Sequence, residues 1–297
     1  MHSLDLLSFS VLMSFWESFS LNLFIINFRL SLIMGHIYRR YGAYYDFIYK
    51  DKNYERECND IVEYFNVYGK SVIHSILDVA CGSGNHSIIL SNMGYSVVGV
   101  DASSVMIRAA SAKVSKGLDV DFKVQDMRCL SLDKTFDAAI CLFGSFGYLL
   151  DDSDIVATLK RIYKHLNENG LFIFDFWPPY SFVILDYTKR RESFRWVEDE
   201  SKRLLRLVNV TFDVNTNIVE YYMECFVFNS SGNLLMDHFQ EKHLLRCFTP
   251  RELSSFLMEV GFIPLSFFDV NWHGEKIYAF DPLKATSSNG VCVAIKS

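Results

Sequence analysis

The segment Ile76–Ser87, ILDVACGSGNHS, decides the fold of this chain. Its apolar start is typical of a buried strand, and two glycines, Gly82 and Gly84, break that strand into a turn. The run that follows, NHSIILSNMG, is typical of a helix. A strand, a glycine turn and a helix in this order place the turn at the carboxyl edge of a sheet, where doubly wound α/β proteins bind ligands.

Strands and helices alternate on both sides of this turn. Strands are expected over residues 72–80, 96–101, 120–126, 136–143 and 171–177, with two more at 262–270 and 290–297. Helices are expected over 54–68, 85–94, 103–117 and 152–170. Alternation over this length predicts an α/β fold with a Rossmann-like, doubly wound, seven-stranded and mostly parallel sheet.

The pattern changes after Pro178. The run LLRLVNVTFDV alternates with a period of two, and an Asn-Thr-Asn turn connects it to IVEYYMECFVF. This indicates an antiparallel β cap inserted between the fifth and sixth strands of the sheet. We therefore expect four parts: an apolar N-terminal extension at 1–33, a core at 34–180, an inserted antiparallel sheet at 181–248 and the end of the core at 249–297.

A helix with clear boundary signals opens the last part. Thr249 is a good N-cap, Pro250 suits the first helical position, and Glu252 completes a capping box. Gly261 is expected to end this helix.

The composition narrows the classes of partner. The 297 residues carry a net charge of −6, so no general basic field is available for a nucleic acid. Seven scattered cysteines without a C-x-x-C pair indicate reduced thiols in a cytoplasmic protein rather than disulfides or a metal site. Residues 1–33 are apolar, but Glu17 interrupts them. A start at Met34 or a loosely attached helix explains this segment better than a membrane anchor.

Three acids lie on or at the ends of successive predicted strands. Asp78 precedes the glycine turn, Asp101 ends the second strand, and Asp126 ends the third, directly before Met127. A dinucleotide-binding turn would have a third glycine where Ser87 stands. A carboxylate such as Asp101 can accept ribose hydroxyls, and Asp126 with Met127 suits an adenine. The three acids therefore favour an adenosine with a cationic, amino-acid-like tail.

The segments ILDVACGSG, VVGVD, VQDM and FDAAICLF resemble the first four motifs of class I S-adenosylmethionine-dependent methyltransferases. The resemblance implies that the cofactor is S-adenosyl-L-methionine. The residues it implies for the cofactor are Asp78, Ala80, Gly82 and Gly84 at the methionine part, Asp101 at the ribose, Asp126 and Met127 at the adenine, and Leu142 nearby. Many members have glycine where this chain has Ala80, and the methyl group is tolerable there if the φ angle of Ala80 is negative.

A narrower resemblance concerns the acceptor. The segments YYDFIYKDKNYERE, CLFGSFGYL and KHLLRCFTPRELSSFLMEVGF look like those of amino-sugar and small-amine N-methyltransferases. Some of these sugar enzymes have a histidine near the acceptor amine where this chain has Tyr148. Tyr148 is accordingly the candidate catalytic residue, able to orient the amine or accept its proton. Tyr45 and its neighbouring tyrosines are candidates to close over the cofactor, or else belong to the core.

The sequence thus predicts a transferase that methylates a small-molecule acceptor, at an amine nitrogen. O-methylation of a small metabolite is the alternative with the same chemistry. A nicotinamide-dependent oxidoreductase and a non-catalytic cofactor-binding protein are alternatives from other classes. The sequence does not decide whether the chain forms a homodimer through the antiparallel sheet.

Overall fold

The computed structural model describes residues 38, 40–183, 191–270, 281–284 and 287–297. The chain divides into Met1–Ile37 and Tyr38–Ser297, and all of the description below concerns the second unit. The expected N-terminal extension at 1–33 lies outside the described residues. Among the described residues, no helix combines the length and apolar character that crossing a membrane requires.

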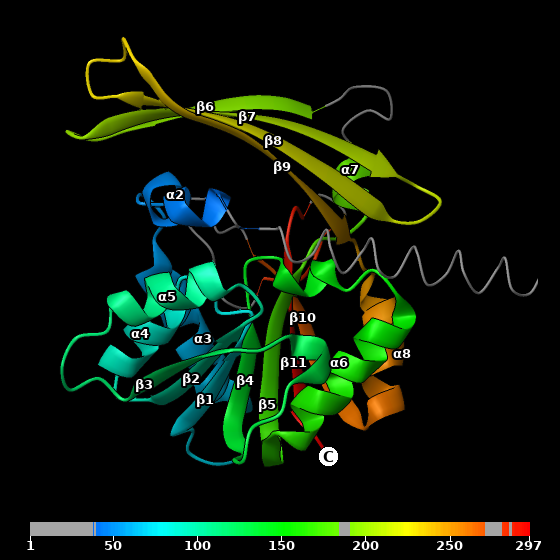
Figure 1. Cartoon of the computed structure of the whole chain (residues 1–297). Helices are drawn as coiled ribbons and strands as arrows, with labels where there is room; N and C mark the ends of the chain where they lie inside the picture. Colours follow the sequence, from blue (N-terminus) through cyan, green and yellow to red (C-terminus); the bar gives the residue numbers. More distant parts are fainter. Residues whose placement is uncertain (1–37, 39, 184–190, 271–280, 285–286) are drawn as a thin grey trace, which may run out of the picture. The chain divides into compact units, whose positions relative to one another are not determined.

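The core is a seven-stranded sheet in the order β10-β11-β5-β4-β1-β2-β3 (Figure 1). Its strands are β1 (Ser75–Val79), β2 (Ser96–Asp101), β3 (Val120–Val124), β4 (Phe136–Cys141), β5 (Leu166–Phe176), β10 (Phe262–Asp269) and β11 (Gly290–Lys296). The pairs among β1 to β5 are parallel, whereas β11 pairs antiparallel with both β5 and β10. The predicted mostly parallel sheet is confirmed.

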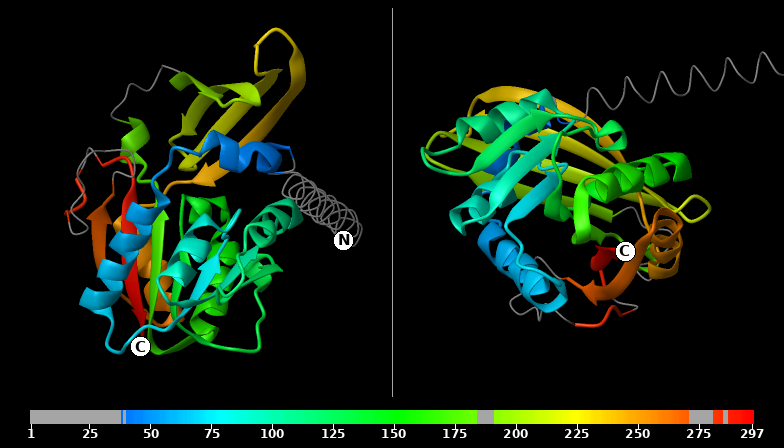
Figure 2. Two further views of the ribbon diagram at one scale, coloured as in Figure 1. Left: turned by 90° about the vertical axis from the view of Figure 1, so that its left-hand side faces the viewer. Right: turned by 90° about the horizontal axis from the view of Figure 1, so that it is seen from below.

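Helices cover both faces of this sheet (Figure 2). They are α3 (Tyr54–Tyr68), α4 (Asn85–Asn92), α5 (Ser104–Ala112), α6 (Asp152–Lys164) and α8 (Pro250–Val260), with short turns at η1 (Met127–Cys129) and η2 (Ser145–Tyr148). The helix α8 begins as predicted, because the Thr249 side chain accepts from the Glu252 backbone N–H at 3.2 Å. It ends at Gly261, whose φ of 109° suits a glycine.

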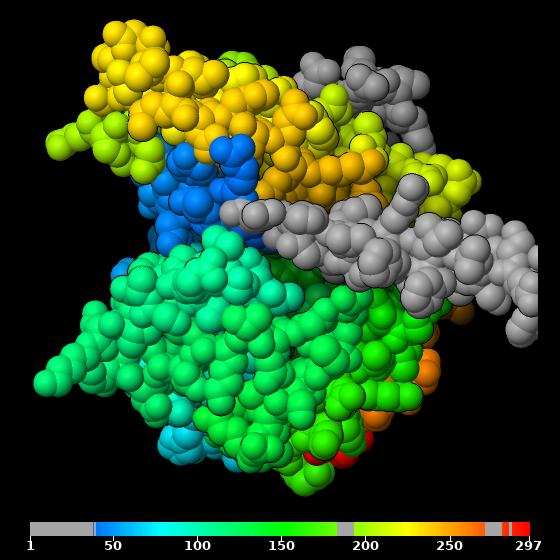
Figure 3. Space-filling view, viewed as in Figure 1, coloured from blue at the N-terminus to red at the C-terminus, as the bar shows by residue number. Residues whose placement is uncertain are grey.

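The cap is an antiparallel sheet in the order β6-β7-β8-β9. Its strands are β6 (Arg191–Glu198), β7 (Lys202–Asp213), β8 (Ile218–Asn229) and β9 (Leu235–Arg246), and α7 (Tyr180–Val183) precedes them. The helix α2 (Tyr41–Ile48) lies between the cap and the core (Figures 1 and 3). The predicted insertion between the fifth and sixth sheet strands is therefore present.

Two predicted helix ends were wrong. The helix expected to reach Gly170 ends at Lys164, and β5 already begins at Leu166. His165 caps this end: its Nδ1–H donates to the Arg161 carbonyl at 2.6 Å, and its Nε2 accepts from the Leu132 N–H at 2.9 Å. The helix expected to reach Gly117 ends at Ala112.

Candidate active site

The glycine turn between β1 and α4 is built from left-handed backbone. Gly82 and Gly84 have φ angles of 56° and 77°. A Cβ on Gly84 would lie 2.5 Å from Cζ of Phe122, so no other residue fits there without displacing that ring. A Cβ on Gly82 would meet nothing within 4 Å. The turn is therefore closed toward β3 and open beside Gly82, where a ligand can approach the backbone.

Ala80 also has a positive φ, at 57°. The condition of a negative φ at this position is therefore not met. Because Ala80 connects the buried strand β1 to the turn, the backbone must follow the left-handed path there whichever residue stands at the position. An alanine in this region costs roughly 1–2 kcal/mol relative to right-handed backbone.

Asp78 lies on β1, directly before this turn, and is only 2% exposed. Its carboxylate accepts from the Ser87 hydroxyl at 2.5 Å. Burial raises its pKa to about 6. An acid held in this way is ionised at neutral pH, and it suits a cationic group better than an anionic one.

Asp101 connects the end of β2 to the turn. Its carboxylate accepts from the backbone N–H of Gly82 at 2.9 Å and from that of Ser103 at 2.7 Å. Burial raises its pKa. These two hydrogen bonds from backbone N–H groups leave lone pairs on both carboxylate oxygens. The carboxylate can therefore still accept hydrogen bonds from hydroxyl groups. The predicted ribose residue therefore lies beside the glycine turn.

Asp126 and Met127 follow β3, as predicted. Asp126 accepts from the backbone N–H of Arg128 at 2.9 Å and pairs with the guanidinium of the same residue at 2.6 Å. Burial opposes ionisation of this carboxyl, but the bonds from Arg128 hold its pKa below the usual value. Met127 packs partly buried against the main core cluster. Residue types alone do not reveal the pairing with Arg128, which occupies part of the carboxylate predicted to accept from the adenine.

Tyr45 and Leu142 are both buried, at 9% and 4% exposed. Tyr45 lies on α2, and its ring meets Phe143, the neighbour of Leu142, edge-on at 6.4 Å. On the same helix, Asp46 accepts from the Ser83 hydroxyl of the glycine turn at 2.6 Å. These contacts join α2 to the ends of β1 and β4.

A cavity of about 200 Å³ lies between the core and the cap. Tyr38, Tyr41 and Tyr49 line it from the N-terminal side, Tyr148 and Asp175 from the core, and Arg206 and His243 from the cap. Phe143, which directly follows the predicted cofactor residue Leu142 after β4, also lines the cavity. The carboxyl ends of β4 and β5 therefore border this aromatic chamber.

Tyr148 makes two side-chain hydrogen bonds within this cavity. Its hydroxyl lies 2.7 Å from Nδ1 of His243 and 2.9 Å from the hydroxyl of Tyr38. Burial raises the pKa of Tyr148 well above its usual value, so the hydroxyl is protonated and can donate to Nδ1. Nε2 of His243 lies 3.4 Å from the Glu241 carboxylate and has no hydrogen-bond partner among the described residues. Sequence reasoning missed His243, because strand alternation does not show which cap residue meets the core.

Asp175 is the second side chain that sequence reasoning missed. It lies near the end of β5, is 2% exposed, and both its oxygens accept from the Gly144 N–H, at 2.9 and 3.0 Å. Burial raises its pKa to about 7. The sequence did contain a signal, because the run LFIFDFW places an acid inside an apolar strand, as ILDVA does for Asp78.

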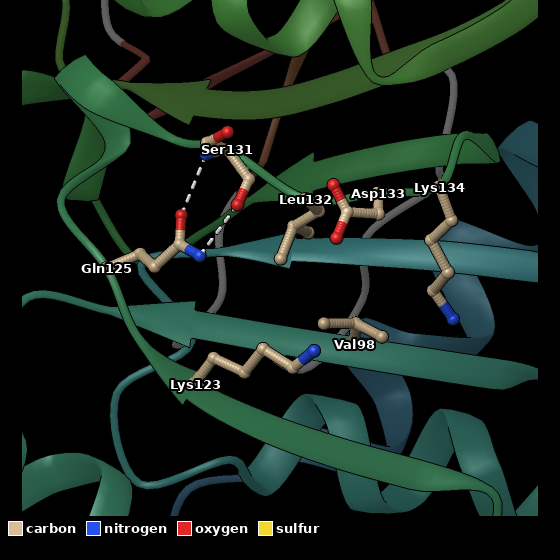
Figure 4. A pocket seen from close by; sticks show the side chains of 7 residues that line it. All are labelled: Val98, Lys123, Gln125, Ser131, Leu132, Asp133 and Lys134. Atoms are coloured by element: carbon tan, nitrogen blue, oxygen red, sulfur yellow. Dashed lines mark hydrogen bonds between the residues drawn. The ribbon is translucent and has the colours of Figure 1, made fainter.

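A second cavity, of about 230 Å³, lies near β2 and β3 (Figure 4). The Gln125 amide bonds the Ser131 backbone on one side of it, at 2.8 and 2.9 Å. Its lining contains the side chains of Lys123, Asp133 and Lys134, but none of the predicted site residues. The chamber under the cap, by contrast, is lined by the predicted catalytic residue Tyr148.

Comparison with known proteins finds a matching domain and several relatives. Residues 76–170 match the family described as "Methyltransferase domain". The dTDP-3-amino-3,6-dideoxy-alpha-D-glucopyranose N,N-dimethyltransferase of Streptomyces fradiae is 31% identical over 45% of this chain and 51% of its own length. The dTDP-3-amino-3,4,6-trideoxy-alpha-D-glucopyranose N,N-dimethyltransferase of Streptomyces venezuelae is 25% identical over 73% of this chain and 87% of its own length.

Coverage of the relatives is uneven. A relative from a Geobacillus strain, 32% identical, is matched over 56% of its length, so the chain spans about half of some of the curated relatives it matches.

Solved structures agree on the fold. The crystal structure of an S-adenosylmethionine-dependent methyltransferase from Clostridium acetobutylicum superposes with a TM-score of 0.71 at 23% identity, over 86% of this chain and 96% of that one. The predicted fold is confirmed by the strand order and by this superposition. Residues 76–170 match a methyltransferase domain, and the chain is similar to S-adenosylmethionine-dependent methyltransferases.

Proposed function

We propose that this chain transfers a methyl group from S-adenosylmethionine to the amine nitrogen of a small acceptor, an amino sugar or a small amine. The observation that carries the proposal is the chamber under the cap, which is lined by a buried acid, Asp175, and by the hydrogen-bonded pair Tyr148 and His243. The two Streptomyces relatives, named as amino-sugar N,N-dimethyltransferases, support it.

The described residues fit the cofactor. The backbone at Gly82 borders open space, and two acids, Asp78 and Asp101, reach the turn from β1 and β2. Asp78 would hold the amino group of the methionine part, Asp101 the ribose hydroxyls, and Asp126 with Met127 the adenine. When bound, the cofactor supplies a methyl group on a positively charged sulfur.

The chain's contribution is to align the acceptor and manage its proton. An amine must be deprotonated before it attacks a methyl group. Asp175, with a pKa near neutrality, can attract an ammonium and take a proton from it. Tyr148 can accept an amine proton at its oxygen while passing its own to Nδ1 of His243. The aromatic walls exclude water and favour a cationic, methylated product by cation–π attraction.

The direct test is a screen of acceptors with purified protein and S-adenosylmethionine. Amino sugars, nucleotide-linked amino sugars and small primary amines are compared with the alcohols that match them, and product mass is measured. Methylation of one or more amines and of no matched alcohol is the expected result. Methylation of alcohols alone would replace the proposal by O-methylation.

We also propose a cytoplasmic location. All seven cysteines are unpaired, and six of them are buried, which suits a reducing compartment.

We also propose that the chain forms a homodimer through the cap. Two large apolar side chains on its edge strand β6, Phe194 and Trp196, are 73% and 52% exposed and could be buried against a second copy. Light scattering of the purified chain would distinguish a monomer from a dimer.

A further inference from the structure

Arg206 on β7 is a cation in the chamber without an acidic partner. Its Nη1 donates to the hydroxyls of Tyr41 and Tyr49, at 3.0 and 3.1 Å. Its Nε is buried and makes no hydrogen bond, and among the residues that the structure describes no carboxylate oxygen lies within 4.0 Å of its guanidinium nitrogens. A guanidinium is always charged at neutral pH, so this position holds an uncompensated positive charge.

The tyrosines beside Arg206 do not neutralise it. Burial raises the pKa of Tyr41 well above its usual value, so its hydroxyl is neutral. The Tyr49 ring lies below the guanidinium, with its centroid 5.6 Å from the Cζ atom. Aromatic and phenolic contacts hold the side chain in place, but the cost of removing a full charge from water is offset only by an anion.

Other arginines of the cap do have such partners. On the same strand, Arg203 pairs with Glu198 at 3.0 Å, and on β9, Arg246 pairs with Glu252 at 2.5 Å. Neither of these two lines the chamber, whereas Arg206 does. Arg195 of β6 also lines the chamber, but it pairs with Asp51 at 3.3 Å. Of the chamber arginines that the structure describes, Arg206 is thus the one whose charge is left for a ligand.

We propose that Arg206 binds an anionic group of the methyl acceptor, a carboxylate or a phosphate, while the acceptor amine lies toward Tyr148 and Asp175. This rests on the proposed function and deepens it. The acceptor class becomes an amine that also carries an anion, such as an amino acid or an amino sugar bearing phosphate. A guanidinium offers a planar pair of donors to either kind of oxyanion.

Calorimetry on the full chain tests this without turnover. Pyrophosphate and acetate are titrated separately into protein saturated with S-adenosylhomocysteine, the demethylated cofactor. We expect one of the two anions to bind with a stoichiometry of one, and the anion that binds identifies phosphate or carboxylate as the acceptor group. Arg206→Gln should weaken that binding by about ten-fold or more, since a charged hydrogen bond is lost.

Two further variants make the result specific. Arg206→Lys keeps the charge and should bind the anion more tightly than Arg206→Gln does. Arg203→Gln removes an arginine of the same strand outside the chamber and should bind as the unmodified chain does. Unchanged S-adenosylhomocysteine affinity in all of them shows that each variant is folded.

Binding of neither anion to the unmodified chain, or equal binding to Arg206→Gln, would overturn the inference while leaving the methyltransferase proposal intact. Failure of the unmodified chain to bind S-adenosylhomocysteine would instead contradict the proposed function itself.

Discussion

Tyr148 and His243 are joined by a hydrogen bond of 2.7 Å although they lie 95 residues apart in the chain. Tyr148 ends η2 of the core, and His243 belongs to β9 of the cap. The bond therefore exists only when the inserted sheet is docked on the core. The candidate proton path, from Tyr148 to His243, is therefore assembled only when the cap docks on the core.

Tyr148→Phe should lower the rate of methyl transfer by about ten-fold or more, because the hydroxyl that receives or orients the amine proton is lost. S-adenosylhomocysteine affinity, measured by calorimetry, should stay nearly the same. Tyr163→Phe is the matched control, since its hydroxyl donates to the Ser297 carbonyl, away from the chamber. A normal rate of methyl transfer in Tyr148→Phe would show that Tyr148 only packs against its neighbours and takes no part in catalysis.

His243→Gln should reduce turnover to a similar extent, because the ring that accepts the Tyr148 proton is lost. The double variant with Tyr148→Phe should be no slower than the slower single variant, since residues that act as a unit are not additive. Rates of the two single variants and the double variant measure this coupling. Fully multiplicative losses would show that the two side chains act independently.

Asp175→Asn should change how stability depends on pH. The ordinary pKa of 3.8 rises to about 7 in the folded protein, so between these values the native state binds more protons than the unfolded state. The contribution of Asp175 to stability is therefore full below about pH 4 and is lost as the pH rises through about 7.

Because asparagine does not ionise, Asp175→Asn should be more stable than the unmodified chain at pH 8, by about 1–3 kcal/mol. Urea unfolding at pH 5 and pH 8 measures the effect, with the exposed Asp121→Asn as control. A difference between the two chains that is equal at both pH values would refute the raised pKa.

Asp101→Ala should weaken S-adenosylhomocysteine binding by about 1–3 kcal/mol, because ribose hydroxyls would lose their acceptor. The Gly82 amide also loses its partner, so the melting temperature is measured alongside. If the variant is folded and its affinity is unchanged, the ribose assignment is wrong.

Ala80→Gly should stabilise the protein by up to about 1 kcal/mol. Relief of left-handed strain outweighs the greater freedom of glycine in the unfolded chain. Thermal melts measure this, and Ala138→Gly, at a fully buried position of β4, should destabilise instead. A lower melting temperature for Ala80→Gly would show that the alanine methyl makes contacts that offset its strained backbone.

Much of the sheet was predictable because its signals are local. The apolar strands, the glycines after β1 and the capping residues of α8 act on the backbone within a few residues, and the structure confirms them. The strand β6 was not predicted. It is an edge strand with large exposed side chains, so no buried face imposes a clear alternation on its sequence.

The candidate site was only partly predictable, because some of its residues have local sequence signals and others do not. Asp78, Asp101 and the glycines follow from their order along parallel strands, which the fold brings to one edge. His243 and Arg206 depend on how the cap docks, and that register has no local signal. The φ of Ala80 and the pairing of Asp126 with Arg128 are set by backbone and side-chain geometry that residue types alone do not specify.

The central claim is tested most directly by titrating the full chain in parallel with S-adenosylmethionine, S-adenosylhomocysteine and NAD in a calorimeter. The structure predicts that both adenosyl compounds bind at one site per chain and that NAD does not. Binding of NAD with no binding of either adenosyl compound would contradict the assignment of the glycine turn and of the acids beside it.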